Sequence, residues 1–112
     1  MEETDHIISI LSDEQSREII NLLSKSELTT QQVSNLLSIP QSTAYRKMKK
    51  LEELEIIKKT KVVRTIEGLD ESYYKNWVFE INIIFRDGKL SHKLEHVKIE
   101  DKIVRLWQKF SE

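Results

Sequence analysis

Polar and basic side chains suited to binding nucleic acid are concentrated between residues 41 and 64. Amide, hydroxyl and guanidinium groups can hydrogen-bond to base edges, and ammonium groups can neutralise phosphates. Arg46 is the foremost candidate, because a guanidinium can grip a guanine edge or a phosphate at two points. The candidates for reading bases are Gln41, Ser42, Thr43, Tyr45 and Arg46. The candidates for holding phosphates are Lys47, Lys49, Lys50, Lys58, Lys59, Lys61 and Arg64.

Catalytic chemistry finds no comparable support in the sequence. The chain has no cysteine and only two glycines, so it offers neither a thiol nucleophile nor a glycine-rich phosphate loop. No histidine stands beside a serine or a carboxylate in an arrangement specific for catalysis. We therefore expect no enzyme activity and no cofactor.

His92 and His96 have the spacing of a metal-binding pair on a helix. On a strand, the same two side chains would lie roughly 13 Å apart, which is too far for one ion. The strand prediction below therefore favours ordinary histidines, although a second chain could still complete a metal site. His6, near acidic residues, is expected to be a solvated side chain.

A helix-turn-helix is predicted to position the candidate base-reading residues. Thr29 and Gln32 have the spacing of a capping box, so a helix should begin there, with Val33, Leu36 and Leu37 as its buried stripe. The Ile39-Pro40 pair should end this helix, because proline disfavours helical backbone in the residue before it. Proline is tolerated at a helix start, so a second helix should begin near Pro40 or Gln41.

The second helix is predicted to pack through one face and to leave the other free. Its packing face consists of Ala44, Met48, Leu51 and Leu54, which recur at helical spacing. The opposite face carries small polar groups at its amino end and cations further along, which is typical of a helix that reads the major groove. The alternative is an ordinary helical hairpin with a solvated, charged face.

Strands are predicted after the second helix. The stretch from Ile56 to Ile66 is rich in β-branched residues and has the two-residue period of a strand, and Glu67-Gly68-Leu69-Asp70 forms a turn signal. A second strand should begin near Tyr73 and continue as 77–85, and the turn Asp87-Gly88 should lead into a third strand, 89–96. A two-residue turn there would pair Phe85 with Leu90, Ile83 with His92 and Ile81 with Leu94. The acidic tip of the first hairpin favours contacts to the DNA backbone from its basic strand rather than deep insertion of the tip.

Helices are also predicted towards both ends of the chain. An apolar segment covers 4–11, and Ser12 with Gln15 suggests a capping box for a helix reaching about Ser24. The last predicted helix runs from about Lys98 to Phe110 and has a wide apolar face. Such a face either packs across its own sheet or pairs with a second copy, and we favour the dimer.

The stretch SIPQSTAYRKMKKLEELEII, residues 38–57, resembles winged-helix transcription regulators of the ArsR type, particularly archaeal ones. The resemblance implies an α+β winged helix-turn-helix in which the first and last helices form a dimer. The dimer candidates are Ile7, Ile8, Leu11, Ile99, Ile103, Leu106, Trp107 and Phe110. Many such proteins have glycine where this chain has Glu55, so we expect the helix to end without a left-handed residue.

The distribution of charge agrees with a DNA-binding centre. The formal net charge is −1, but residues 39–65 carry eight basic and three acidic side chains, a net of +5, and residues 1–38 carry two and seven, a net of −5. Phosphates respond to the local field, because distant charges are screened. With no membrane-spanning run or signal segment in the sequence, we expect a cytoplasmic protein.

The sequence thus predicts a winged helix-turn-helix domain with an extended antiparallel wing sheet over residues 1–97, followed by a dimerisation helix at 98–112. The expected function is that of a homodimeric transcription regulator that binds double-stranded DNA. The rival hypothesis is a winged-helix protein-interaction module that does not touch DNA. A sensor of a small molecule is a third hypothesis, since an apolar pocket leaves no sequence motif.

Overall fold

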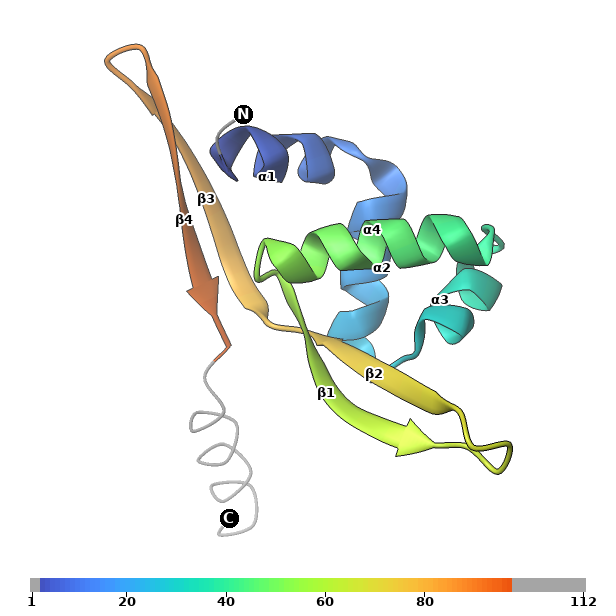
Figure 1. The fold of residues 1–112 in the computed structure, drawn as a ribbon. Helices are drawn as coiled ribbons and strands as arrows, with labels where there is room; N and C mark the ends of the chain where they lie inside the picture. Colours follow the sequence, from blue (N-terminus) through green and yellow to red (C-terminus); the bar gives the residue numbers. More distant parts are fainter. Residues whose placement is uncertain (1–2, 98–112) are drawn as a thin grey trace, which may run out of the picture.

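Four helices precede four strands in the computed structural model, which describes residues 3–97 (Figure 1). This order and the two antiparallel hairpins confirm the predicted α+β winged helix-turn-helix. The predicted helix at 98–110, and the dimer candidates Ile99, Ile103, Leu106, Trp107 and Phe110 with it, lie outside the described residues. The elements are α1 Glu3–Ser12, α2 Glu14–Lys25, α3 Thr30–Leu37, α4 Gln41–Glu53, β1 Ile57–Arg64, β2 Asp70–Asn76, β3 Val78–Arg86 and β4 Lys89–His96.

The hydrophobic core lies between the helices and the roots of the hairpins. It contains Ile7, Ile10, Ile19, Leu23, Val33, Ala44, Met48, Leu51, Leu54, Ile56, Ile57 and Val78. The predicted packing face of α4 is thereby confirmed. One dimer candidate needs correction: Ile7 has no exposed surface and belongs to this core, whereas Ile8 and Leu11 are half-buried.

The start of α2 differs from the prediction by one residue. Ser12 ends α1, with its hydroxyl donating to the Ser9 carbonyl oxygen at 2.7 Å, so it does not cap α2. The cap is Asp13, whose carboxylate accepts hydrogen bonds from the backbone N–H and the hydroxyl of Ser16, at 3.1 and 2.7 Å. A carboxylate is as good an N-cap as a serine hydroxyl, so the adjacent aspartate can take the position.

The helix-turn-helix forms as the capping signals predict. Both hydrogen bonds of the Thr29–Gln32 capping box are present, at 2.9 and 3.1 Å, and α3 ends at Ser38 in the left-handed conformation. Pro40 then caps α4 without a side-chain hydrogen bond.

Leu36 was predicted to be buried and is 60% exposed. Ser34 is buried in the same helix, where its hydroxyl donates to the Ile39 carbonyl oxygen at 2.6 Å and ties α3 to the turn. The inward face of the eight-residue helix α3 consists of Val33, Ser34 and Leu37, and Leu36 lies outside this face.

The end of α4 uses a left-handed residue after all. Glu55 has φ of 61°, which corrects the expectation that this helix ends without one. Its N–H donates to the Glu52 carbonyl oxygen at 3.0 Å, and the Ile56 N–H donates to the Leu51 carbonyl oxygen at 2.9 Å. These two bonds form a Schellman motif, and the buried side chains of Leu51 and Ile56 supply its hydrophobic contact.

The first hairpin, β1–β2, is the wing. Its strands pair from Ile57 with Asn76 to Arg64 with Asp70, and Gly68 occupies the turn with φ of 82°. The second strand therefore begins three residues before the predicted Tyr73. The pairing shifts between Lys59 and Lys61, so Thr60 forms a bulge in β1.

The second hairpin, β3–β4, has the predicted register: Phe85 pairs with Leu90, Ile83 with His92 and Ile81 with Leu94. Asp87 and Gly88 both have positive φ, as a two-residue hairpin turn requires. This hairpin runs beside α1 (Figure 1), where Thr4 Oγ1 lies 2.6 Å from His92 Nδ1.

The two hairpins form separate two-stranded sheets, which corrects the expectation of one strand continuing through Trp77. The Asn76 side chain accepts from the Val78 N–H at 3.1 Å and donates to the Val78 carbonyl oxygen at 2.8 Å. Trp77 instead donates its backbone N–H to Ile56 at 2.9 Å. The chain is therefore bent between β2 and β3. Within residues 3–97, no helix has the length and apolar character needed to cross a bilayer.

Candidate nucleic-acid interface

The free face of α4 presents most of the predicted DNA-binding residues. Burial of Ala44, Met48 and Leu51 fixes the rotation of the helix about its axis, so the opposite side chains must face solvent. Tyr45 is 59% exposed, which places it outside the core. Thr43 is half-buried. The other exposed candidates on this helix are Gln41, Ser42, Arg46, Lys49 and Lys50.

Lys47 has a different position from its neighbours. Its ammonium group forms an ion pair with Asp13, and its side chain is only 15% exposed. A lysine held in this way by a carboxylate is poorly placed to reach a phosphate. The structure therefore corrects the predicted phosphate contact: Lys47 fastens the start of α2 to α4.

The Asp13 carboxylate is stabilised in its charged form by this arrangement. Hydrogen bonds from Lys47 and then from Ser16 lower the pKa of Asp13 to about 2. Sequence reasoning missed Asp13, although its spacing of three residues from Ser16 and its place before the helix are visible cap signals.

A hollow of about 270 Å³ adjoins this ion pair, and it exposes cations beside the helix-turn-helix. Arg46 and Lys50 line it from α4, and Ser9 and Ile10 line it from α1. Two exposed cations on one rim form a suitable position for a phosphate next to the bases that α4 would face.

The basic residues of the wing point to two opposite faces. The side chain of Ile57 is buried in the core, and Tyr74 packs against this core. Lys59 is paired with Tyr74 and therefore projects on the core side of the sheet. Arg64, beyond the bulge, shares this side by alternation. Because of the bulge at Thr60, Lys58 and Lys61 both project on the other side.

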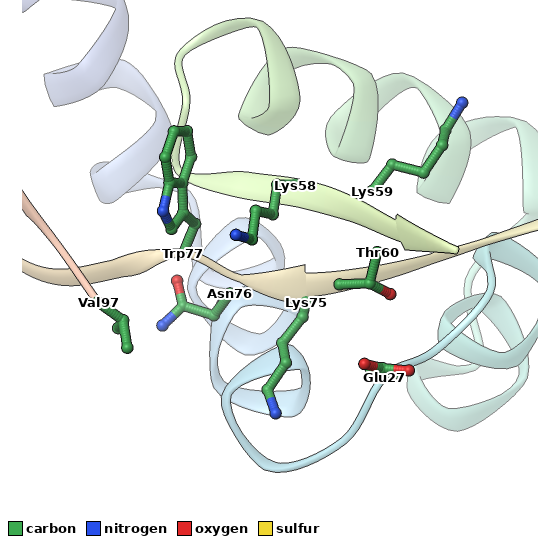
Figure 2. Close-up of a pocket in the computed structure, with 8 residues that line it drawn as sticks. All are labelled: Glu27, Lys58, Lys59, Thr60, Lys75, Asn76, Trp77 and Val97. Carbon is green, nitrogen blue, oxygen red and sulfur yellow. The ribbon is translucent and has the colours of Figure 1, made fainter. Parts of the chain in front are cut away.

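Contacts in the structure agree with this division. The Lys58 ammonium lies over the Trp77 ring, 5.2 Å from its centre, and the Lys61 ammonium lies over the Tyr73 ring at 4.8 Å. Lys61 also pairs with Glu27 at 3.6 Å. Figure 2 shows Lys59 projecting upward on the side of α4 and Lys75 projecting downward. The four predicted wing contacts are thus not brought together on one surface.

Tyr74 connects the wing to the helix-turn-helix. Its backbone exchanges two hydrogen bonds with Leu28, at 2.9 and 3.1 Å, just before α3 begins. Burial, and next the carboxylate of Glu52 on α4, raise the pKa of the Tyr74 hydroxyl above its ordinary value. The sequence marked Tyr74 only as a strand residue, because its partners depend on the tertiary fold.

Both strand histidines have structural contacts in the described region. Besides the contact of His92 with Thr4, His96 Nε2 lies 2.8 Å from the Glu55 carbonyl oxygen, and its ring stacks on Trp77 with centres 4.0 Å apart. Within residues 3–97, no three metal-binding side chains are grouped closely enough to hold an ion.

Comparison with known proteins agrees with this geometry. Residues 13–59, from α2 to the start of β1, match the family described as "Bacterial regulatory protein, arsR family". A search of curated proteins found no match. A solved structure described as "Possible transcriptional regulator from Methanosarcina mazei Go1" has a similar fold, with a TM-score of 0.54 and 23% identity. The similarity covers 67% of this chain and 65% of that one.

Proposed function

Taking the arsR-type helix-turn-helix as the premise, we propose that this protein is a transcription regulator that binds double-stranded DNA through α4. The observation that carries the proposal is the exposed face of α4, on which hydrogen-bonding side chains at the amino end are followed by cations. The buried residues on the opposite side of α4 fix the orientation of this face. In this proposal, α4 lies in the major groove with its amino end towards the bases.

The residues divide into two roles. Gln41, Ser42, Thr43, Tyr45 and Arg46, at the amino end of α4, are proposed to read base edges. Lys49 and Lys50 from α4, with Lys59 and Arg64 from the wing, are proposed to hold phosphates and so set the register of the helix.

We further propose that the protein acts as a homodimer. A two-fold dimer would present two α4 helices to two half-sites about one DNA turn apart, or ~34 Å, and each half-site would then contribute to affinity. Half-buried Ile8 on α1 is available for such a contact, and Leu11, whose side chain packs partly against the core, could contribute its remaining exposed surface.

The test is selection from a pool of random DNA duplexes at two salt concentrations, with the solution mass measured in parallel. The expected result is a two-fold symmetric motif whose binding weakens with salt, with a slope of about −0.9 per phosphate contact. The variant Lys49→Ala should flatten the slope, and Lys89→Ala at the β3–β4 turn is the matched control. No DNA retention at low salt would favour the protein-interaction module instead.

A further inference from the structure

The far face of the wing carries a group of cations that the proposed DNA contacts do not use. Lys58 and Lys75 are directly opposite each other on β1 and β2, on the side away from the core. Like charges in directly opposed positions destabilise a sheet. Within residues 3–97, neither lysine forms an ion pair with a carboxylate, so an anion placed between them would relieve this repulsion.

These lysines line a hollow of about 340 Å³, which falls in the size range of small-molecule sites. Figure 2 shows Trp77 and Val97 towards one end of the hollow and Glu27 and Thr60 towards the other. The hollow therefore has an apolar, aromatic end and a polar end, with lysines between them.

The aromatic wall is held in place before any ligand arrives. The Trp77 ring stacks on His96, whose Nε2 is 2.8 Å from the Glu55 carbonyl oxygen. The Trp77 backbone donates to Ile56 at 2.9 Å and accepts from Val97 at 2.8 Å. A rigid wall of this kind reduces the entropy lost when a planar molecule stacks on it.

The acidic residue at the polar end does not exclude an anion. Glu27 is paired with Lys61 at 3.6 Å, so its charge is already balanced. The Lys58 ammonium lies over the Trp77 ring, 5.2 Å from its centre, and within residues 3–97 neither Lys58 nor Lys75 is paired with a carboxylate, so both can attract the ligand's negative group.

We propose that this hollow binds a small aromatic carboxylate. The ligand's carboxylate accepts hydrogen bonds from the Lys58 and Lys75 ammonium groups, and its ring packs against Trp77 and Val97. Lys59 also lines the hollow, but its side chain projects on the side of α4 (Figure 2), so its proposed DNA contact lies on the face of the wing opposite Lys58 and Lys75.

The test is titration of the full chain with 2-naphthoate, followed by ¹H–¹⁵N NMR. The expected result is saturable shifts at the Trp77 indole N–H and at the backbone of β1 and β2. Naphthalene-2-methanol, which lacks the charge, and acetate, which lacks the ring, should each bind at least about tenfold more weakly, as expected when one charged hydrogen-bonding group or the stacking surface is lost.

The decisive variant is Lys75→Met, which removes a like-charge neighbour and so should leave the fold intact. It should weaken naphthoate binding about tenfold and leave DNA affinity unchanged, whereas Lys89→Met should alter neither. Unaltered naphthoate affinity in Lys75→Met, acetate binding as tight as naphthoate, or shifts confined to other regions would each overturn the proposal. Failure of the DNA selection would not affect this result, because the readout is the shift of Trp77.

Discussion

Arg46 is the residue whose role in recognition is most open to a direct test. It is exposed on α4 and lines the hollow beside Lys50, so it can reach either a base edge or a phosphate. If it reads a base, Arg46→Ala should cost about 1 to 3 kcal/mol on the selected site and little on random DNA. Binding measured on both duplexes checks this, and equal losses on the two would assign Arg46 to a phosphate.

Glu55 occupies a backbone conformation that a residue with a side chain adopts at a cost. Glu55→Gly should stabilise the protein by about 0.5 to 1 kcal/mol, since glycine tolerates φ of 61° and the hydrogen bonds of the motif involve only backbone atoms. Urea denaturation measures the change. Glu55→Ala is the control and should not stabilise; equal gains from both variants would attribute the effect to the lost side chain.

Asp13 makes the free energy of unfolding depend on pH in the acidic range. Its folded pKa of about 2 lies below its ordinary value of 3.8, so its contribution is complete above pH ~4 and is lost as pH falls towards 2. Asp13→Ala should cost about 1 to 2 kcal/mol at pH 7 through loss of the cap.

Asp13→Asn separates the two effects, because the amide oxygen can still cap α2 but cannot pair with Lys47 as an anion. Urea midpoints measured between pH 7 and pH 2 should show the wild type losing its advantage over Asp13→Asn as Asp13 protonates. If the difference in urea midpoint between the wild type and Asp13→Asn stayed constant from pH 7 to pH 2, the ion pair with Lys47 would not be its cause.

At the scale of elements, the wing carries basic side chains on both of its faces. A one-residue bulge at Thr60 changes which basic residues share a face, because it places Lys61 with Lys58 and Lys75 on the side away from the core. The wing can therefore support α4 with one face and bind a different partner with the other.

This division predicts unequal effects of neighbouring substitutions on DNA binding. Lys59→Ala should make the dependence of log affinity on log salt concentration less steep by about 0.9, which corresponds to the loss of one phosphate contact. Lys58→Ala should leave this slope unchanged. The measurement is log affinity against log salt concentration for both variants on the selected duplex. Equal reductions would mean that DNA contacts both faces of the wing.

At the scale of the whole molecule, the proposed DNA surface and the second hairpin belong to different elements. The basic face lies on α4, and the β3–β4 hairpin extends beside α1 (Figure 1). Exposed apolar residues on that hairpin, such as Ile84, Phe85 and Leu90, add to the surface available for association.

The proposed dimer can be tested on α1. Ile8 is half-buried and is not part of the core, so Ile8→Lys should shift the protein towards monomer without unfolding it. Ser9→Lys, at the exposed neighbouring position, is the matched control. Sedimentation velocity across a concentration series gives the result; a dimer that survives Ile8→Lys would exclude this face of α1 from the interface.

Local signals in the sequence were sufficient for the helix-turn-helix and the second hairpin. The Thr29–Gln32 capping box, the Pro40 turn and the Asp87-Gly88 turn each act within a few residues, so they could be interpreted without knowing the fold. The packing face of α4 followed from its spacing, and exposure of its opposite face followed in turn.

The tertiary structure decided the features that depend on residues distant in the chain. The pairing of Lys47 with Asp13 spans 34 residues, and the burial of Ile7 depends on how α1 docks. The register of the first hairpin is set by its bulge and five-residue connection, and the turn signal at Glu67-Gly68-Leu69-Asp70 did not specify either of them. Sequence alone therefore indicated candidate DNA-binding residues, and only packing decided which of these candidates share a surface.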